Sequence, residues 1–218
     1  MDFKGFAKHR LIRQTIMGLV FVTILFGGWW YPLLGYFIPL CMLLGMGIAV
    51  FQGRLWCDWY CPRGSFYDLF IKPISANKTI PALLKGMPFR VAVVLLLMTI
   101  MTWQLVSRWP DGLSIGHFFV IMLTVTTVIG LVLAIIYQQR AWCCFCPIGS
   151  MTNWLGRHRY PLWIDSSKCT DCKRCYEVCP IQVAPFQFKG ESREAVRDGD
   201  CLKCRLCVYA CPPKALTL

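Results

Sequence analysis

Long uncharged stretches alternate with basic segments over the first part of the chain. From Gln14 to Gly53, 40 residues contain no Asp, Glu, Lys or Arg. Because a helix needs roughly 20 apolar residues to cross the hydrocarbon core of a bilayer, this stretch predicts two spans. The turn between them is expected in residues 27–32, where two glycines, three aromatic residues and a proline occur together.

Two more uncharged stretches follow a basic central segment. Residues 91–107 predict a third span, and residues 112–139, interrupted only by His117, predict a fourth span near residues 117–138. The pattern therefore predicts an α-helical membrane bundle of four transmembrane helices, arranged as two repeated hairpins. The segment 66–87 carries scattered apolar residues between lysines and is expected to lie on the membrane surface.

The composition and the charge distribution agree with a membrane protein. Apolar residues make up 56% of the chain and charged residues 16%, where a water-soluble domain has about 25% charged residues. Lys and Arg precede the first span, separate the second from the third and follow the fourth, whereas the two opposite loops carry only Arg108. This asymmetry predicts a bacterial or archaeal inner-membrane protein with cytoplasmic N- and C-termini. A cleaved signal peptide is the weaker explanation of the basic start, because no small-residue cleavage pattern follows the apolar run.

The positive charge indicates which partners to expect. Residues 1–162 contain 14 basic and 4 acidic residues, a net charge of +10, whereas residues 163–218 contain 9 and 7, a net charge of +2. Since the excess lies next to the predicted spans, it favours contact with anionic lipid headgroups over nucleic-acid binding.

Eight of the 14 cysteines lie in the tail and form two copies of the pattern C-x2-C-x2-C-x3-C-P. In two-cluster ferredoxins the first three cysteines of such a run bind one [4Fe–4S] cluster and the fourth binds the other. The predicted ligands of the two clusters are Cys169, Cys172, Cys175 and Cys211 for one, and Cys201, Cys204, Cys207 and Cys179 for the other. Disulfides are disfavoured on the cytoplasmic side, and zinc sites do not normally show the third cysteine and the Cys-Pro ending.

The division of the chain follows from this motif. Residues 1–162 are expected to form the membrane domain, and residues 163–218 a C-terminal α+β two-cluster ferredoxin-like domain. The charged segment 189–194 is expected to be a surface loop. Because so small a domain has little apolar core, its folding should depend on cluster binding.

A second repeat follows the second and fourth predicted spans, where the pattern R-x-W-C…C-P-x-G-S occurs twice. The repeated residues are Arg54, Trp56, Cys57 and Cys61 in the first copy and Arg140, Trp142, Cys143 and Cys146 in the second. Two duplicated hairpins should pack about a pseudo-twofold axis, so that their loops face each other and supply four thiolates for a third iron–sulfur cluster. The two arginines would offset its negative charge and raise its reduction potential.

The second loop is one residue shorter and contains an additional thiol, Cys144. It therefore stays open whether Cys143 or Cys144 is the ligand. Reduced structural thiols or palmitoylation sites are the alternative explanation of these loop cysteines. The remaining cysteine, Cys41, lies within a span and is assigned no role.

With both cysteine repeats and the four spans, nearly the whole chain resembles the NapH-type membrane iron–sulfur proteins. That group includes the quinol-dehydrogenase membrane component of periplasmic nitrate reductase systems and the similar membrane portions of NosR-type and CcoG-type proteins. The resemblance implies a redox subunit that passes electrons between quinone and a cytochrome, iron–sulfur or catalytic subunit. Its CcoG-type members suggest an alternative, a membrane reductase that acts as a maturation factor for the metal or cofactor of a respiratory enzyme.

Quinol oxidation requires an apolar slot, a proton acceptor and a nearby electron carrier. His117 is a candidate because it is polar and lies within or beside a span, although it would be near the outer surface, opposite the inferred clusters. An interfacial histidine that anchors the helix is the alternative. A slot near the arginines of the two loops, lined by Trp56, Trp59, Tyr60 and Trp142, would couple to the clusters more directly. The sequence leaves both positions open.

Overall fold

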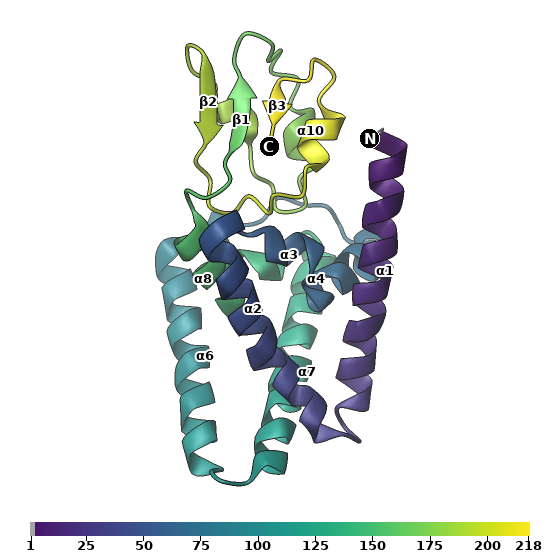
Figure 1. Ribbon diagram of the computed structural model, residues 1–218, viewed down its shortest axis with the longest axis vertical. Coiled ribbons are helices and arrows are strands. Elements are labelled where there is room, and N and C mark those ends of the chain that lie inside the picture. The colour runs from purple at the N-terminus through teal and green to yellow at the C-terminus, as the bar shows by residue number, and fades with distance from the viewer. Residues whose placement is uncertain (1–2) are drawn as a thin grey trace.

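A bundle of long helices carries a small cap of strands and short helices at one end (Figure 1). This computed structural model describes residues 3–218. The long helices are α1 (Phe3–Gly27), α2 (Phe37–Gln52), α6 (Met87–Ser107) and α7 (Gly112–Ile136), with the short turn η1 (Pro32–Tyr36) before α2. Four helical stretches, within α1, η1 with α2, α6 and α7, are long and apolar enough to cross a membrane, as the uncharged stretches predict.

Two spans begin earlier than the hydrophobic pattern predicts. Helix α1 continues through the basic N-terminal segment, because Arg10 in that segment forms ion pairs with the central segment of the chain. Helix α7 begins at Gly112, where the Asp111 carboxylate accepts hydrogen bonds from the backbone N–H groups of Leu113 and Ser114 at 3.1 and 3.4 Å. This N-cap starts the helix before the residues that the apolar pattern marks.

The long helices pack both within one repeat and against elements of the other. Helix α2 packs on α8 (Pro147–Gly156), which follows the second cysteine loop, whereas α1 packs on α4 (Pro62–Phe66), which follows the first. Helix α7 crosses η1 so closely that a Cβ atom on Gly35 would collide with the carbonyl oxygen of Gly116. Close packing of this kind between small residues is common among transmembrane helices.

Part of the central segment is buried in the protein interior. It contains α3 (Leu55–Trp59), α4, η2 (Tyr67–Ile71), η3 (Lys72–Ile74) and α5 (Ala82–Lys85). Tyr67 is fully buried, and the Ser75 hydroxyl donates to the carbonyl of Ala134 at 2.7 Å. Several side chains of residues 66–87 therefore face the protein interior, whereas others, such as Ile74 and Leu83, are exposed, and the expected position on the membrane surface stays a prediction.

The tail forms a three-stranded antiparallel sheet in the order β2–β1–β3. Its elements are β1 (Leu162–Asp165), α9 (Arg174–Glu177), η5 (Pro185–Phe188), β2 (Arg193–Val196), α10 (Leu206–Ala210) and β3 (Leu216–Thr217). Leu162 pairs with Val196, and Ile164 lies between Glu194 and Leu216. The expected surface loop 189–194 is thus shorter, since its last two residues begin strand β2.

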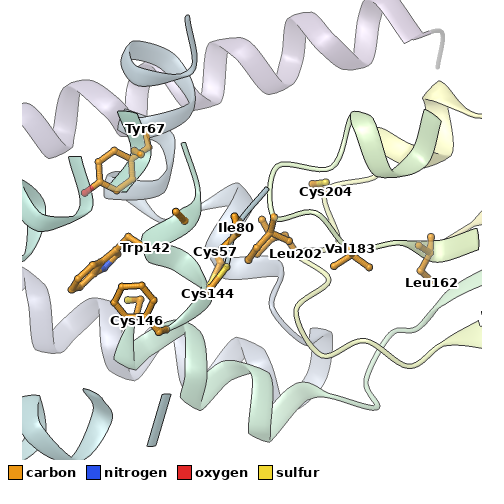
Figure 2. Packing of buried hydrophobic residues seen from close by; sticks show 14 of the residues in the cluster. Cys57, Tyr67, Ile80, Trp142, Cys144, Cys146, Leu162, Val183, Leu202 and Cys204 are labelled. Atoms are coloured by element: carbon orange, nitrogen blue, oxygen red, sulfur yellow. The ribbon is translucent and has the colours of Figure 1, made fainter. Parts of the chain in front are cut away.

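A continuous apolar core joins the tail to the cysteine loops. The buried side chains of this core run from Trp142 and Cys57 through Ile80 and Leu202 to Leu162 of the sheet (Figure 2). The second cysteine loop contains η4 (Ala141–Cys144), which lies on this path. The tail therefore packs directly against the loop end of the bundle.

Candidate iron–sulfur site

One cavity of the tail is lined by the four cysteines predicted for the first cluster. Cys169, Cys172, Cys175 and Cys211 share it with the apolar side chains of Ile164, Phe186 and Leu216, among others. Cys175 lies in α9, whereas Cys211 directly follows α10, so the fourth cysteine comes from the other repeat. Cys172 is exposed, which places this cavity at the surface of the tail.

The second tail cavity is lined by the complementary set. Cys201, Cys204, Cys207 and Cys179 face it together with Leu162, Val183 and Leu202, among others. This cavity lies on the side of the tail that meets the bundle. Gln138 donates to the Cys179 carbonyl at 3.2 Å, and the indole N–H of Trp59 donates to the Lys203 carbonyl at 3.4 Å.

A third cavity, of about 120 Å³, lies between the two cysteine loops at the end of the bundle. Its lining includes Cys57, Cys61, Cys143 and Cys146 but not Cys144. Cys144 is fully buried in the core between the loops and the tail, and burial raises the pKa of its thiol to about 12. The structure thus brings together the four cysteines predicted for the third cluster and places Cys143, and not Cys144, among them.

Each cysteine loop is held by the arginine of the other loop. Arg54 donates to the Cys143 carbonyl at 2.8 Å, and Arg140 donates to the Cys57 carbonyl at 2.6 Å. The glycine after each Cys-Pro pair leaves room for these guanidinium groups, because a Cβ atom on Gly64 would collide with Arg140. The equivalent Gly149 has the same relation to Arg54, where the added Cβ would lie 2.7 Å from Nη2. The reciprocal contacts are those of two copies related by a pseudo-twofold axis.

Both arginines also pair with carboxylates. Arg54 contacts Asp200 of the tail at 2.7 Å, and Asp200 pairs with Arg90 as well and accepts from Asn153 at 2.7 Å. Burial alone would raise the pKa of Asp200, but the arginines and Asn153 lower it below its ordinary value.

Arg140 forms the equivalent carboxylate contacts at the bundle side of the cavity. It donates to both oxygens of Asp68 at 2.9 and 2.8 Å, and its Nη2 lies 3.5 Å from Asp58. Arg10 joins the same two carboxylates from α1. These two arginines and two carboxylates balance in charge.

The third cavity contains polar groups that fit an iron–sulfur cluster. Within the described part of the chain, the indole N–H groups of Trp56 and Trp142 have no hydrogen-bond acceptor, although their residues are only 8% and 4% exposed and line the cavity. A buried N–H without an acceptor costs free energy, and the sulfur atoms of a cluster and its thiolates are acceptors that would satisfy it. Among residues 3–218, no three His, Cys, Asp or Glu side chains stand close enough to hold a single metal ion. Four thiolates that bind four different irons of a cluster stand farther apart than that.

The third cavity continues from the cysteines into the bundle. Apolar side chains from all four long helices line it there, among them Phe21, Phe37, Met98 and Leu123. His117 is not among the lining residues. It lies in the first turns of α7, about 28 Å from the cysteine end of that helix at ~1.5 Å per residue, so the structure does not bring it to the loops.

Several charged residues of the site have no clear signal in the sequence. Asp58 lies in α3, Asp68 in η2 and Asp200 just before Cys201, and nothing in their spacing points to the arginines that they contact. Arg63, which lines the third cavity, directly follows a Cys-Pro pair but has no counterpart in the second repeat, where Ile148 stands. The available signal was the proximity of Arg63 to Cys61.

Two protein families match the chain. A 4Fe-4S binding domain matches residues 34–81 and 119–164, which contain the two cysteine loops. A 4Fe-4S dicluster domain matches residues 161–212, which contain the eight tail cysteines. No solved structure matches the chain.

Curated relatives agree with these matches. The ferredoxin-type protein NapH of Haemophilus influenzae is 26% identical over 179 residues, covering 76% of this chain and 62% of the relative, and NapH of Escherichia coli is 27% identical over 180 residues, covering 76% and 61%. A ferredoxin of Methanothermococcus thermolithotrophicus is 35% identical over 57 residues, covering 25% of this chain and 92% of the ferredoxin. The chain thus spans about three fifths of the length of these NapH proteins.

Proposed function

Because the chain belongs to the family of NapH-like, ferredoxin-type membrane proteins, we propose that it passes electrons between membrane quinone and a partner redox subunit. A role in iron–sulfur electron transfer follows from the family itself. The direction of electron flow, the use of quinone and the identity of the partner are what we propose. The relatives give no support to the alternative of a maturation factor.

The observation that carries the proposal is the arrangement of three cysteine-lined cavities in series. The third cavity, which we call the membrane-face cavity, lies between the two cysteine loops. The cavity of Cys201, Cys204, Cys207 and Cys179 borders the bundle, and the cavity with the exposed Cys172 lies farther out. [4Fe–4S] clusters at these three places would each accept and donate one electron at a time. The positions of the three cysteine sets in the fold determine the order of the clusters.

The contacts between the first two cavities are direct. Arg54 joins the Cys143 carbonyl to Asp200, the residue before Cys201. Trp59 and Gln138 bind the backbone around Cys204 and Cys179. These hydrogen bonds hold the tail at one distance from the loops, as electron transfer between fixed carriers requires.

The apolar part of the membrane-face cavity is the place that we assign to the quinone ring. Side chains from the four spans surround it. A flat apolar molecule would reach the cysteine loops from this side. The exposed edge of the tail near Cys172 is then the surface for the partner subunit, and both termini lie on that side of the membrane, which we take to be cytoplasmic.

The test is iron and sulfide counting on anaerobically purified protein, with C143S and C144S compared. Wild type should hold about twelve irons in three [4Fe–4S] clusters. C143S should lose about four of them because it removes a cavity ligand, whereas C144S, the matched control one residue away, should keep them all.

Reduction of the clusters by a short-chain quinol, followed by EPR, then tests the electron donor. A count of eight irons per chain in wild type would contradict the presence of a cluster in the membrane-face cavity. If no quinol reduces the clusters and no quinone oxidises them, the proposed function is contradicted.

A further inference from the structure

Arg63 lines the membrane-face cavity, is partly buried and has no carboxylate partner among residues 3–218. Arg10, Arg54, Arg90 and Arg140 all form ion pairs within 4.0 Å. The nearest polar groups to Arg63 are instead the Thr126 hydroxyl, which accepts from Nη1 at 3.0 Å, and the Cys146 sulfur, 3.4 Å from Nη2.

Arg63 is nevertheless held in one place. Its guanidinium carbon lies 5.1 Å from the centre of the Trp142 ring, in a cation–π contact. Together with Thr126 of α7 and Cys146 of the second loop, this ring fixes the charge at the cavity wall. The position is thus set by three contacts, one from α7 and two from the second cysteine loop.

The fold of the loop does not require an arginine at this position. The second repeat has the same Cys-Pro-x-Gly-Ser sequence and also begins a helix at its proline, with Ile148 in place of Arg63, and Ile148 lines the same cavity. The charge is therefore a one-sided addition to an otherwise repeated structure.

An unpaired guanidinium beside an apolar cavity is costly unless a negative charge compensates it. Four thiolates around an iron–sulfur core provide such a charge, and the addition of one electron makes that core more negative by one unit. A nearby cation therefore stabilises the reduced form more than the oxidised form. The carboxylates in contact with Arg54 and Arg140 weaken the same effect from those two residues.

We propose that Arg63 is the positioning residue that raises the reduction potential of the membrane-face cluster and so sets its place in the electron path. The inference rests on the proposed function, because it needs a cluster between Cys57, Cys61, Cys143 and Cys146. The sequence repeat suggests that Arg54 and Arg140 raise this potential, whereas here the effect comes from Arg63, which occurs in only one of the two repeats.

The experiment is an anaerobic EPR redox titration, with dithionite as the electron donor, of wild type, R63Q, R63K and the control R13Q. Arg13 lies at the same end of the bundle over the rings of Trp59 and Tyr60 but does not line the cavity. In R63Q one cluster should show at least a tenfold lower ratio of reduced to oxidised form at a fixed potential, a shift of about 59 mV to more negative values. R63K should lie between R63Q and wild type, and R13Q should match wild type.

Iron counts on the same samples separate the possible failures. Eight irons in wild type would overturn the third cluster and the inference with it, whereas twelve irons with equal potentials in wild type and R63Q would overturn the inference alone. If R63Q loses the cluster, R63K decides: twelve irons with a potential near that of wild type support the role of the charge. Loss of the cluster in R63K, or a shift as large in R13Q, contradicts it.

Discussion

The ion pairs of Asp200 hold the tail on the bundle, and D200N should release it. The carboxylate contacts Arg54 and Arg90, whose side chains are 1% and 6% exposed, while its own side chain is 10% exposed. Removal of one partner from a buried pair costs roughly 3–5 kcal/mol, because it leaves the other charge unpaired. Since water reaches little of this site, solvent reduces that cost only slightly.

This magnitude predicts a large change in local opening. At 1.4 kcal/mol per tenfold, a loss of about 3 kcal/mol increases the opening equilibrium more than about 100-fold. Amide hydrogen exchange of residues 198–204, measured by mass spectrometry on the cluster-loaded protein in detergent, should accelerate by that factor in D200N. The slow exchange of helices α6 and α7 should remain unchanged.

The matched control is D165N, which removes an exposed ion pair of the same domain. Asp165 contacts Lys168 at 2.9 Å, and the two side chains are 32% and 59% exposed. Such an exposed pair contributes little to stability, so D165N should change the exchange of residues 198–204 by less than about fivefold. If D200N exchanges like D165N, the reasoning that Asp200 holds the tail on the bundle is refuted.

Three further substitutions test other parts of the structure. G64A places a methyl group against the Arg140 guanidinium and 2.9 Å from the Cys57 carbonyl oxygen, so it should lower the free energy of unfolding by about 1–3 kcal/mol in a thermal melt, whereas G47A, with no atom within 4 Å, should not. D68N should cost roughly 3–5 kcal/mol because Arg140 loses its charged partner and one of its two hydrogen bonds to this side chain. Burial alone would raise the pKa of Asp68, but its contacts with arginines lower the pKa below its ordinary value. The stabilisation should therefore be complete above about pH 3.9 and be lost as the pH falls through the lowered pKa of the folded state. Equal thermal melts of wild type and D68N at pH 7 would contradict it. His117→Gln should leave both the iron count and the rate of reduction by quinol unchanged, and a large fall in that rate would move the quinone site to the other end of α7.

The helices and the cysteine sets could be predicted because their signals are local. A span needs only a continuous uncharged stretch, and a ferredoxin motif needs only a fixed spacing. The cavity around Cys169 and Cys211, and the spans within α2 and α6, follow from such patterns. Which of Cys143 and Cys144 faces the third cavity did not follow, because that depends on how two loops meet.

The charged contacts of the site could not be predicted for a different reason. Arg54 and Asp200 are 146 residues apart, and no periodicity connects them. The burial of Tyr67 and Ser75 could not be predicted, because apolar side chains that face lipid and those that face a protein core have the same pattern in the sequence. Only the packing of α1, α4 and α7 distinguishes the two.

Because the arginine of each cysteine loop binds a carbonyl of the other loop, the membrane-face cavity forms only when both hairpins are present. The Cys57 carbonyl is held by Arg140, and the Cys143 carbonyl by Arg54, so neither cysteine loop is complete in the absence of the other repeat. Asp200 then ties Arg54 to the tail. Since a cluster would bind only where four thiolates already face one another, its insertion should require that both hairpins are paired. A chain that holds the third cluster is then one in which the two halves of the membrane domain have assembled correctly.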